Sequence, residues 1–191
     1  VGKQKGDDAI EDRGRRYFQS YIMANLTVAK NILDTSTDKE IELPFILHLL
    51  ERINSKFIPS ERLYLYAQGI YFGLKNDYSL CAHILLPQIE NSLRYIAQQR
   101  DIVTTKLTED IQYENTMGGV LNKIRVYTNP DLWNELNHFL ITGENFRNEV
   151  MHGLMPHTKI FNLGIYLWWL SIKMIYNADE YFFKDTSQEN T

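Results

Sequence analysis

The sequence contains a single cysteine, Cys81, among its 191 residues. One cysteine excludes an intrachain disulfide and a cysteine-rich zinc site, and it fits a reducing compartment, so we expect a cytoplasmic protein. The chain also lacks an excess of basic residues, because its formal net charge is −4 at pH 7. Proteins that bind duplex nucleic acid through its phosphates are normally basic. The charge therefore counts against a general DNA-binding surface, but not against a local cleft that meets one or two phosphates.

A long apolar run is also missing. The most apolar stretch, 160–176, is interrupted by Asn162, Ser171 and Lys173, which is typical of a buried helix rather than a membrane span. The start of the chain has no signal-peptide pattern, and no Gly-rich phosphate loop is present. We therefore expect no membrane association and no bound cofactor.

Apolar residues make up 44% of the chain and aromatic residues 13%, enough for one domain with a sizeable core. They recur at helical spacing through most of the sequence, which predicts an all-α fold. No convincing strand is found, and residues 101–115 are predicted as a loop. The predicted helices cover about 12–33, a short stretch opening at Pro44, 61–75, 78–100, 118–127, 131–152 and 159–183.

The predicted helices fall into an extension and a domain. Residues 1–58 form an N-terminal helical extension with a frayed lead-in over 1–12, 59–184 form a helical domain, and 185–191 form a disordered tail. Ser60 is a credible N-cap for the helix that opens the domain. The short connection Asn76-Asp77 forces two helices into an antiparallel hairpin, and Pro87 should kink the second. From Val1 in place of Met we expect either a piece of a longer chain or a processed chain.

The stretch 143–157 carries the residues with the most chemistry. It reads as the last turns of a helix that stops at Gly153, a residue type that adopts the left-handed conformation at helix ends. Asn148 and His152 are four residues apart and share a helix face, while Arg147 lies roughly 140° round from His152. A permanent cation, an amide and a side chain that titrates near neutrality are the groups needed to hold a phosphodiester and move a proton beside it.

Arg147-Asn148-x-x-x-His152 resembles the Arg, polar residue, spacer, His motif of the HEPN superfamily, and the resemblance covers roughly residues 60–183. It implies a HEPN-like helical bundle that forms a homodimer. Many such domains are metal-independent endoribonucleases of toxin–antitoxin, phage-defence and RNA-processing systems. The implied partners are therefore RNA, a second copy, and an antitoxin or other domains of a longer chain.

The resemblance also assigns roles within RNA cleavage by the substrate's own 2′-hydroxyl. His152 acts as general base or acid, Arg147 binds the phosphate and stabilises the charge of the transition state, and Asn148 orients either group. A two-fold dimer brings two such helices to one cleft. Apolar residues that either face the partner or belong to the ordinary core are Phe139, Leu140, Phe146, Val150, Trp168 and Trp169.

A second group of candidates lies in the segment 85–94. Glu90 and Arg94 are four residues apart and form either a surface pair contributing a few tenths of a kcal/mol or a support that orients Arg147 or His152. Asn91 is a weaker candidate for the same role. No metal site is predicted, because the helix breaks between His152 and His157 and no cysteine lies near.

Two other functions fit the sequence. A non-catalytic HEPN-type module would bind RNA or nucleotide, or dimerise a larger protein, and the acidic net charge favours it. A purely structural helical domain would use its aromatic faces to bind protein. The motif residues also have a purely structural interpretation. Arg147 would lie on the surface, Asn148 would make a hydrogen bond at the helix end, and His152 would lie in the last turn, where the helix dipole favours histidine.

Overall fold

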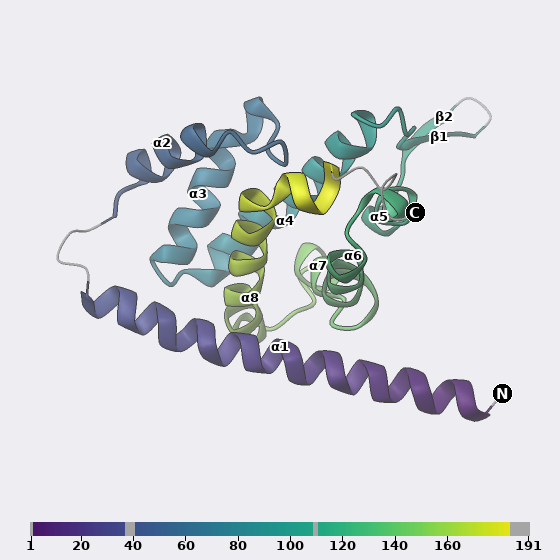
Figure 1. Cartoon of the computed structure of the whole chain (residues 1–191), viewed down its shortest axis with the longest axis horizontal. Coiled ribbons are helices and arrows are strands. Elements are labelled where there is room, and N and C mark those ends of the chain that lie inside the picture. Colours follow the sequence, from purple (N-terminus) through teal and green to yellow (C-terminus); the bar gives the residue numbers. More distant parts are fainter. Residues whose placement is uncertain (1, 37–40, 109–110, 184–191) are drawn as a thin grey trace, which may run out of the picture.

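The computed structural model describes residues 2–36, 41–108 and 111–183, and it shows an all-α fold with one small β-hairpin within these ranges (Figure 1). The predicted tail, 185–191, lies outside them. In chain order the elements are α1 (Gly2–Ser36), α2 (Leu43–Ile53), η1 (Ser60–Arg62), α3 (Leu63–Leu74), α4 (Tyr78–Gln98), β1 (Thr105–Thr108), β2 (Ile111–Glu114), α5 (Met117–Lys123), η2 (Arg125–Tyr127), α6 (Pro130–Leu136), η3 (Asn137–Thr142), α7 (Phe146–Met151), α8 (His157–Tyr176) and η4 (Asp179–Phe183).

The predicted helical hairpin is confirmed as α3 and α4, which pack along each other across a three-residue connection. Asp77 caps α4, because its side chain accepts a hydrogen bond from the Leu80 N–H at 3.0 Å. The prediction that Ser60 caps the first helix is wrong, since Ser60 begins a 3-10 turn and α3 starts only at Leu63. α4 continues as a helix through Pro87.

The core lies where α3, α4 and α8 meet. Glycines let these helices approach closely: a Cβ on Gly73 would clash with the Trp168 ring, and one on Gly164 would lie 2.8 Å from the backbone oxygen of Tyr78. The Trp168 indole N–H donates to the Ile70 carbonyl at 3.1 Å, which satisfies its polar atom in the core. Cys81 is fully buried, and burial raises the pKa of its thiol, as fits a small core residue.

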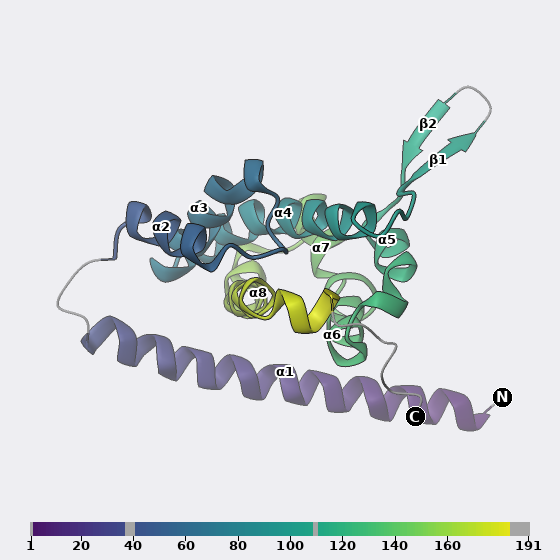
Figure 2. The ribbon, with the colours of Figure 1, turned by 45° about the horizontal axis from the view of Figure 1, so that its top comes forward.

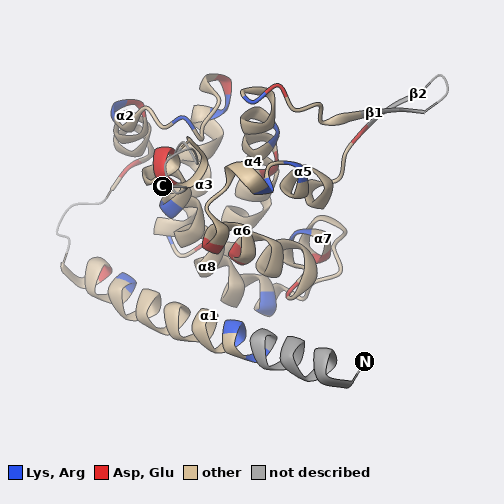
Figure 3. Cartoon of the chain, turned by 45° about the vertical axis from the view of Figure 1, so that its right-hand side comes forward, with Lys and Arg blue, Asp and Glu red and all other residues tan. Residues whose placement is uncertain are grey.

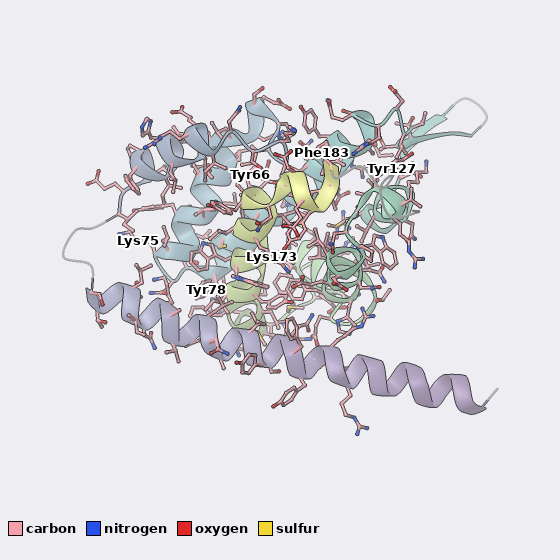
Figure 4. The ribbon with its side chains drawn as sticks, viewed as in Figure 1. Tyr66, Lys75, Tyr78, Tyr127, Lys173 and Phe183 are labelled. Carbon is pink, nitrogen blue, oxygen red and sulfur yellow. The ribbon has the colours of Figure 1, made fainter. Side chains whose placement is uncertain are left out.

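α1 runs along one side of the bundle (Figure 1). The prediction of a frayed lead-in over 1–12 is wrong for residues 2–12, because α1 begins at Gly2. Near its C-terminal end, Asp34 accepts hydrogen bonds from the buried Lys30 and from Asn76 of the α3–α4 connection. These bonds hold the pKa of Asp34 below its ordinary value. Tyr78, which donates to Asn76 at 3.1 Å, lies close to α1 (Figure 4). The network ties α1 to the turn of the hairpin.

The predicted boundary at 58/59 stays a prediction. Ile46 and Leu50 of α2 are buried in the same core cluster as the helices that follow, and Ile22 and Leu26 of α1 pack against that cluster. The N-terminal helices thus share the core of the predicted domain.

Two other predictions are wrong. The predicted loop over 101–115 contains an antiparallel hairpin, β1–β2, in which Thr105 pairs with Glu114. Figure 2 shows this hairpin projecting from the body of the molecule beyond the end of α4. The predicted helix over 131–152 is divided into α6, the π-helix η3 and α7. The break has a local cause: the Gly143 N–H bonds to the His138 carbonyl at 2.8 Å, and Asn145 adopts a left-handed conformation with φ of 50°.

Basic and acidic residues are interspersed over the described helices (Figure 3). Among these helices, none combines the length and the apolar character that crossing a membrane requires.

Candidate functional site

The short helix α7 carries the predicted motif and is fixed by its apolar face. Phe146 and Val150, four residues apart, are both buried and therefore point into the core. The Phe146 ring stacks on Phe139 of η3 with centroids 4.9 Å apart. With this face buried, Arg147 and Asn148 remain half-buried at its edge and His152 is exposed after the last turn.

Arg147 makes a double contact with Glu90 of α4. Its Nε and Nη2 both donate to Oε2 of Glu90, at 3.1 Å and 2.8 Å. The side chains of Arg147 and Glu90 are 23% and 15% exposed, so the pair lies at the border between core and solvent. The contact that the sequence left open for Glu90 is present, although 57 residues separate the partners.

Glu90 also contacts Arg94, four residues further along α4, and both side chains are largely buried, at 15% and 18% exposed. Arg94 Nη2 donates to Oε1 of Glu90 at 2.8 Å, and its Nη1 donates to Glu114 at 2.8 Å. Arg94 Nη2 also donates to the Asn115 carbonyl at 2.5 Å. The two oxygens of Glu90 are thus divided between two arginines, which keeps each guanidinium in one orientation.

Asn148 extends this network along α7. Its Oδ1 accepts a hydrogen bond from Arg147 Nη1 at 3.0 Å, and its Nδ2 donates to Asn145 Oδ1 at 2.8 Å. Three of the five guanidinium N–H groups of Arg147 are therefore used, on Nε, Nη1 and Nη2. Within the part of the chain that the structure describes, the second N–H on each Nη makes no hydrogen bond.

His152 lies at the end of α7, one turn after Asn148. Its backbone N–H donates to the Asn148 carbonyl at 3.0 Å, which places the imidazole directly after the motif turn. Gly153 follows with φ of 67°, the left-handed conformation predicted for it. The N–H groups of Leu154 and Met155 then return to the Glu149 carbonyl at 2.8 Å and 3.1 Å. This turn closes the helix end and leaves His152 exposed to solvent.

The structure thus joins Arg147, Asn148, Glu90 and Arg94 by side-chain hydrogen bonds and connects His152 to them through the backbone. Asn91 is half-buried on α4 and takes no part in the hydrogen bonds that join Glu90 to the two arginines. The sequence reading missed Asn145, Glu114 and Asn115. Gly143 and Asn145 within four residues were a signal for a helix break, because both residue types favour turns.

The apolar residues considered for a partner face belong largely to the core. Phe139, Leu140 and Phe146 are fully buried, Val150 is 2% exposed and Trp168 is 9% exposed. Trp169 packs against the same cluster. Exposed apolar side chains do occur beside the motif, at Met151 and Leu154.

A cavity of about 320 Å³ lies elsewhere, between α1, the start of α4 and α8. It is lined by Thr27, Lys30, Asn31, Asn76, Tyr78, Phe161, Asn162 and Ile165, so the predicted site residues do not line it. The described residues hold no cluster of three or more His, Cys, Asp or Glu side chains placed to bind a metal ion.

Comparisons of the chain with protein-family models, with curated proteins and with solved structures found no match.

Proposed function

We propose that this chain is a metal-independent endoribonuclease of the HEPN type. The single observation that carries the proposal is the arrangement at the end of α7: a guanidinium held by Glu90 lies five residues before an exposed imidazole. A fixed cation lowers the cost of binding a phosphate in one orientation. A solvent-exposed imidazole is available to take up or release a proton.

In the proposed reaction the 2′-hydroxyl of the substrate attacks the adjacent phosphorus. The 2′-oxygen–phosphorus bond forms, the bond from phosphorus to the 5′-oxygen of the next nucleotide breaks, and a 2′,3′-cyclic phosphate remains. His152 accepts the proton of the 2′-hydroxyl or gives one to the leaving 5′-oxygen. Arg147 binds the phosphate with the N–H groups that Glu90 and Asn148 leave available, and it stabilises the charge of the transition state.

A second copy would supply the other histidine, so that one imidazole acts as base and the other as acid. The exposed Met151 and Leu154 beside the motif are the side chains that we assign to this two-fold contact. The test is sedimentation equilibrium of wild type and Leu154→Asp. We expect a dimer that becomes a monomer in the variant, because a buried carboxylate at the contact would be unpaired. A wild-type monomer at assay concentrations excludes the two-histidine arrangement.

The cleavage test uses purified protein, single-stranded RNA and excess chelator. We expect products with 2′,3′-cyclic phosphate ends, and a loss of at least about a hundredfold in rate for both Arg147→Ala and His152→Ala. His83→Ala is the matched control, because His83 is also an exposed histidine, on α4, and it should retain full activity. RNA with a 2′-deoxy sugar at the cleaved position should stay intact. Activity that survives in His152→Ala, or that requires a divalent metal, refutes the proposal.

A non-catalytic module that binds RNA or nucleotide is the second candidate. Two observations favour it: Glu90 already neutralises Arg147, and the net charge of the chain is −4. RNA binding that depends on Arg147 without any cleavage would establish it in place of the nuclease. A purely structural domain that binds other proteins would show neither binding nor cleavage.

A further inference from the structure

The β-hairpin ends against the helix that supports the site. Glu114 is the last residue of β2 and Asn115 follows it directly. Asn115 is buried, and both its backbone N–H and its side-chain Nδ2 donate to the Thr104 carbonyl, at 2.9 Å and 2.5 Å. Two hydrogen bonds to one carbonyl close the base of the hairpin and fix the orientation of the Asn115 peptide.

This fixed peptide is what Arg94 contacts. The Asn115 carbonyl accepts from Arg94 Nη2 at 2.5 Å, and the Glu114 carboxylate accepts from Arg94 Nη1 at 2.8 Å. Arg94 is therefore held from the hairpin side by two acceptors and from the helix side by Oε1 of Glu90. A side chain with partners on both sides has one orientation, whereas an arginine paired only four residues along its own helix keeps much of its rotamer freedom.

We infer that Asn115 and Glu114 are positioning residues for Arg147, acting through Arg94 and Glu90. Arg94 occupies Oε1 of Glu90, which leaves Oε2 as the acceptor for Nε and Nη2 of Arg147. Without Arg94 in place, Glu90 would be able to rotate and offer both oxygens to Arg147, and the guanidinium would turn with it. The hairpin thus sets the direction in which the remaining N–H groups of Arg147 point.

The charges and exposures of the acidic side chains support the same inference. Two arginines face two carboxylates in this cluster, but Glu114 is 63% exposed whereas Glu90 is 15% exposed. Solvent screens the Glu114 pair, so its electrostatic contribution is small. Glu114 therefore serves mainly to orient Arg94, while the Asn115 carbonyl makes the shorter hydrogen bond to Arg94. We expect changes at Asn115 to matter more than changes at Glu114.

The test measures the Arg147 side chain itself and needs no RNA. Only the expected effect on catalysis rests on the proposed function. Solvent exchange of the Arg147 Nε–H is measured by NMR on the full ¹⁵N-labelled chain, and its signal is identified by its loss in Arg147→Lys. We expect exchange about fivefold faster in Asn115→Ala and about twofold faster in Glu114→Gln, as for the loss of part of one hydrogen bond. Glu90→Gln, which changes the acceptor itself, must accelerate exchange and serves as the positive control.

Thr105→Ala is the matched control, because Thr105 pairs with Glu114 across the hairpin, and it should leave exchange as in wild type. The inference is overturned if Arg147 Nε–H exchanges at the wild-type rate in both Asn115→Ala and Glu114→Gln, even if Asn115→Ala lowers overall stability.

If the wild type cleaves RNA, Asn115→Ala should lower kcat about fivefold and change KM less than about twofold, since Arg147 acts in the transition state. An unchanged kcat overturns the positioning role in catalysis. If the wild type cleaves nothing, the proposed function fails while the exchange measurement still decides this inference.

Discussion

Replacing Glu90 with glutamine tests the centre of the site without changing its shape. Glu90 accepts three charge-assisted hydrogen bonds, two from Arg147 at 3.1 Å and 2.8 Å and one from Arg94 at 2.8 Å. Glutamine keeps one acceptor oxygen but turns an N–H₂ donor toward one of the guanidinium groups. At about 1 kcal/mol for each of two affected interactions, we expect Glu90→Gln to lower the free energy of unfolding by about 2 kcal/mol.

This value is below the roughly 3–5 kcal/mol that breaking a fully buried ion pair costs. The reason is solvent access, because the side chains of Glu90, Arg94 and Arg147 are 15%, 18% and 23% exposed. For a chain of this size the loss corresponds to a decrease in Tm of about 4–8 °C.

Urea unfolding followed by circular dichroism measures the change. Glu51→Gln is the matched control, because the Glu51 side chain is 54% exposed on α2, and we expect it to change the free energy of unfolding by less than about 0.5 kcal/mol. A double-mutant cycle of Glu90→Gln with Arg147→Gln should give a coupling free energy of about 1 kcal/mol. A loss in Glu90→Gln no larger than in the control, or a coupling near zero, would show that the pair does not hold Arg147.

Three further predictions concern packing and titration. Gly164→Ala should lower the free energy of unfolding, measured in urea, by about 1–3 kcal/mol, because the new Cβ would lie 2.8 Å from the Tyr78 backbone oxygen. Gly14→Ala is the control: a Cβ there has no atom within 4 Å, so the substitution should not lower the free energy of unfolding. Asp34→Asn should be less stable than wild type at pH 7 and equal to it at strongly acidic pH, because the pKa of Asp34 is lowered and its contribution is lost as the pH falls through the folded-state value; a difference independent of pH would contradict this. Burial raises the pKa of Tyr78 to about 12. The contribution of Tyr78 to the stability of the fold is therefore present below about pH 10 and is lost as the pH rises toward 12. The stability difference between wild type and Tyr78→Phe should shrink over that range, and a constant difference would refute the assignment.

Much of the fold follows from patterns that a short stretch of chain contains. The antiparallel α3–α4 hairpin follows from helical spacing on both sides of Asn76-Asp77, and the helix stop at Gly153 follows from the one residue type that tolerates a left-handed φ without strain. The predicted short helix at Pro44 also appears, as α2. Each of these features depends on residues within a few turns of one another.

The break in the predicted helix over 131–152 has a local signal and also involves a distant neighbour. Apolar residues recur at helical spacing before and after Gly143 and Asn145, the two residues whose turn preference is the local signal for the break. At the break, Gly143 packs so closely against the His138 ring that a Cβ there would clash with Nε2. His138 is itself buried, and its Nδ1 lies 3.4 Å from the Gln19 side chain of α1. The contact between His138 and α1 is tertiary, so no local pattern predicts it.

For the candidate site, the sequence by itself determined the order and spacing of Arg147, Asn148 and His152 and the stop that follows them, because residues within six positions of one another stay close along the chain. Only the tertiary structure decided that Glu90 reaches Arg147 across 57 residues and that the end of a β-hairpin holds Arg94. Such contacts arise when helices pack on a shared core, and packing brings together side chains whose separation in sequence carries no information about their distance in space.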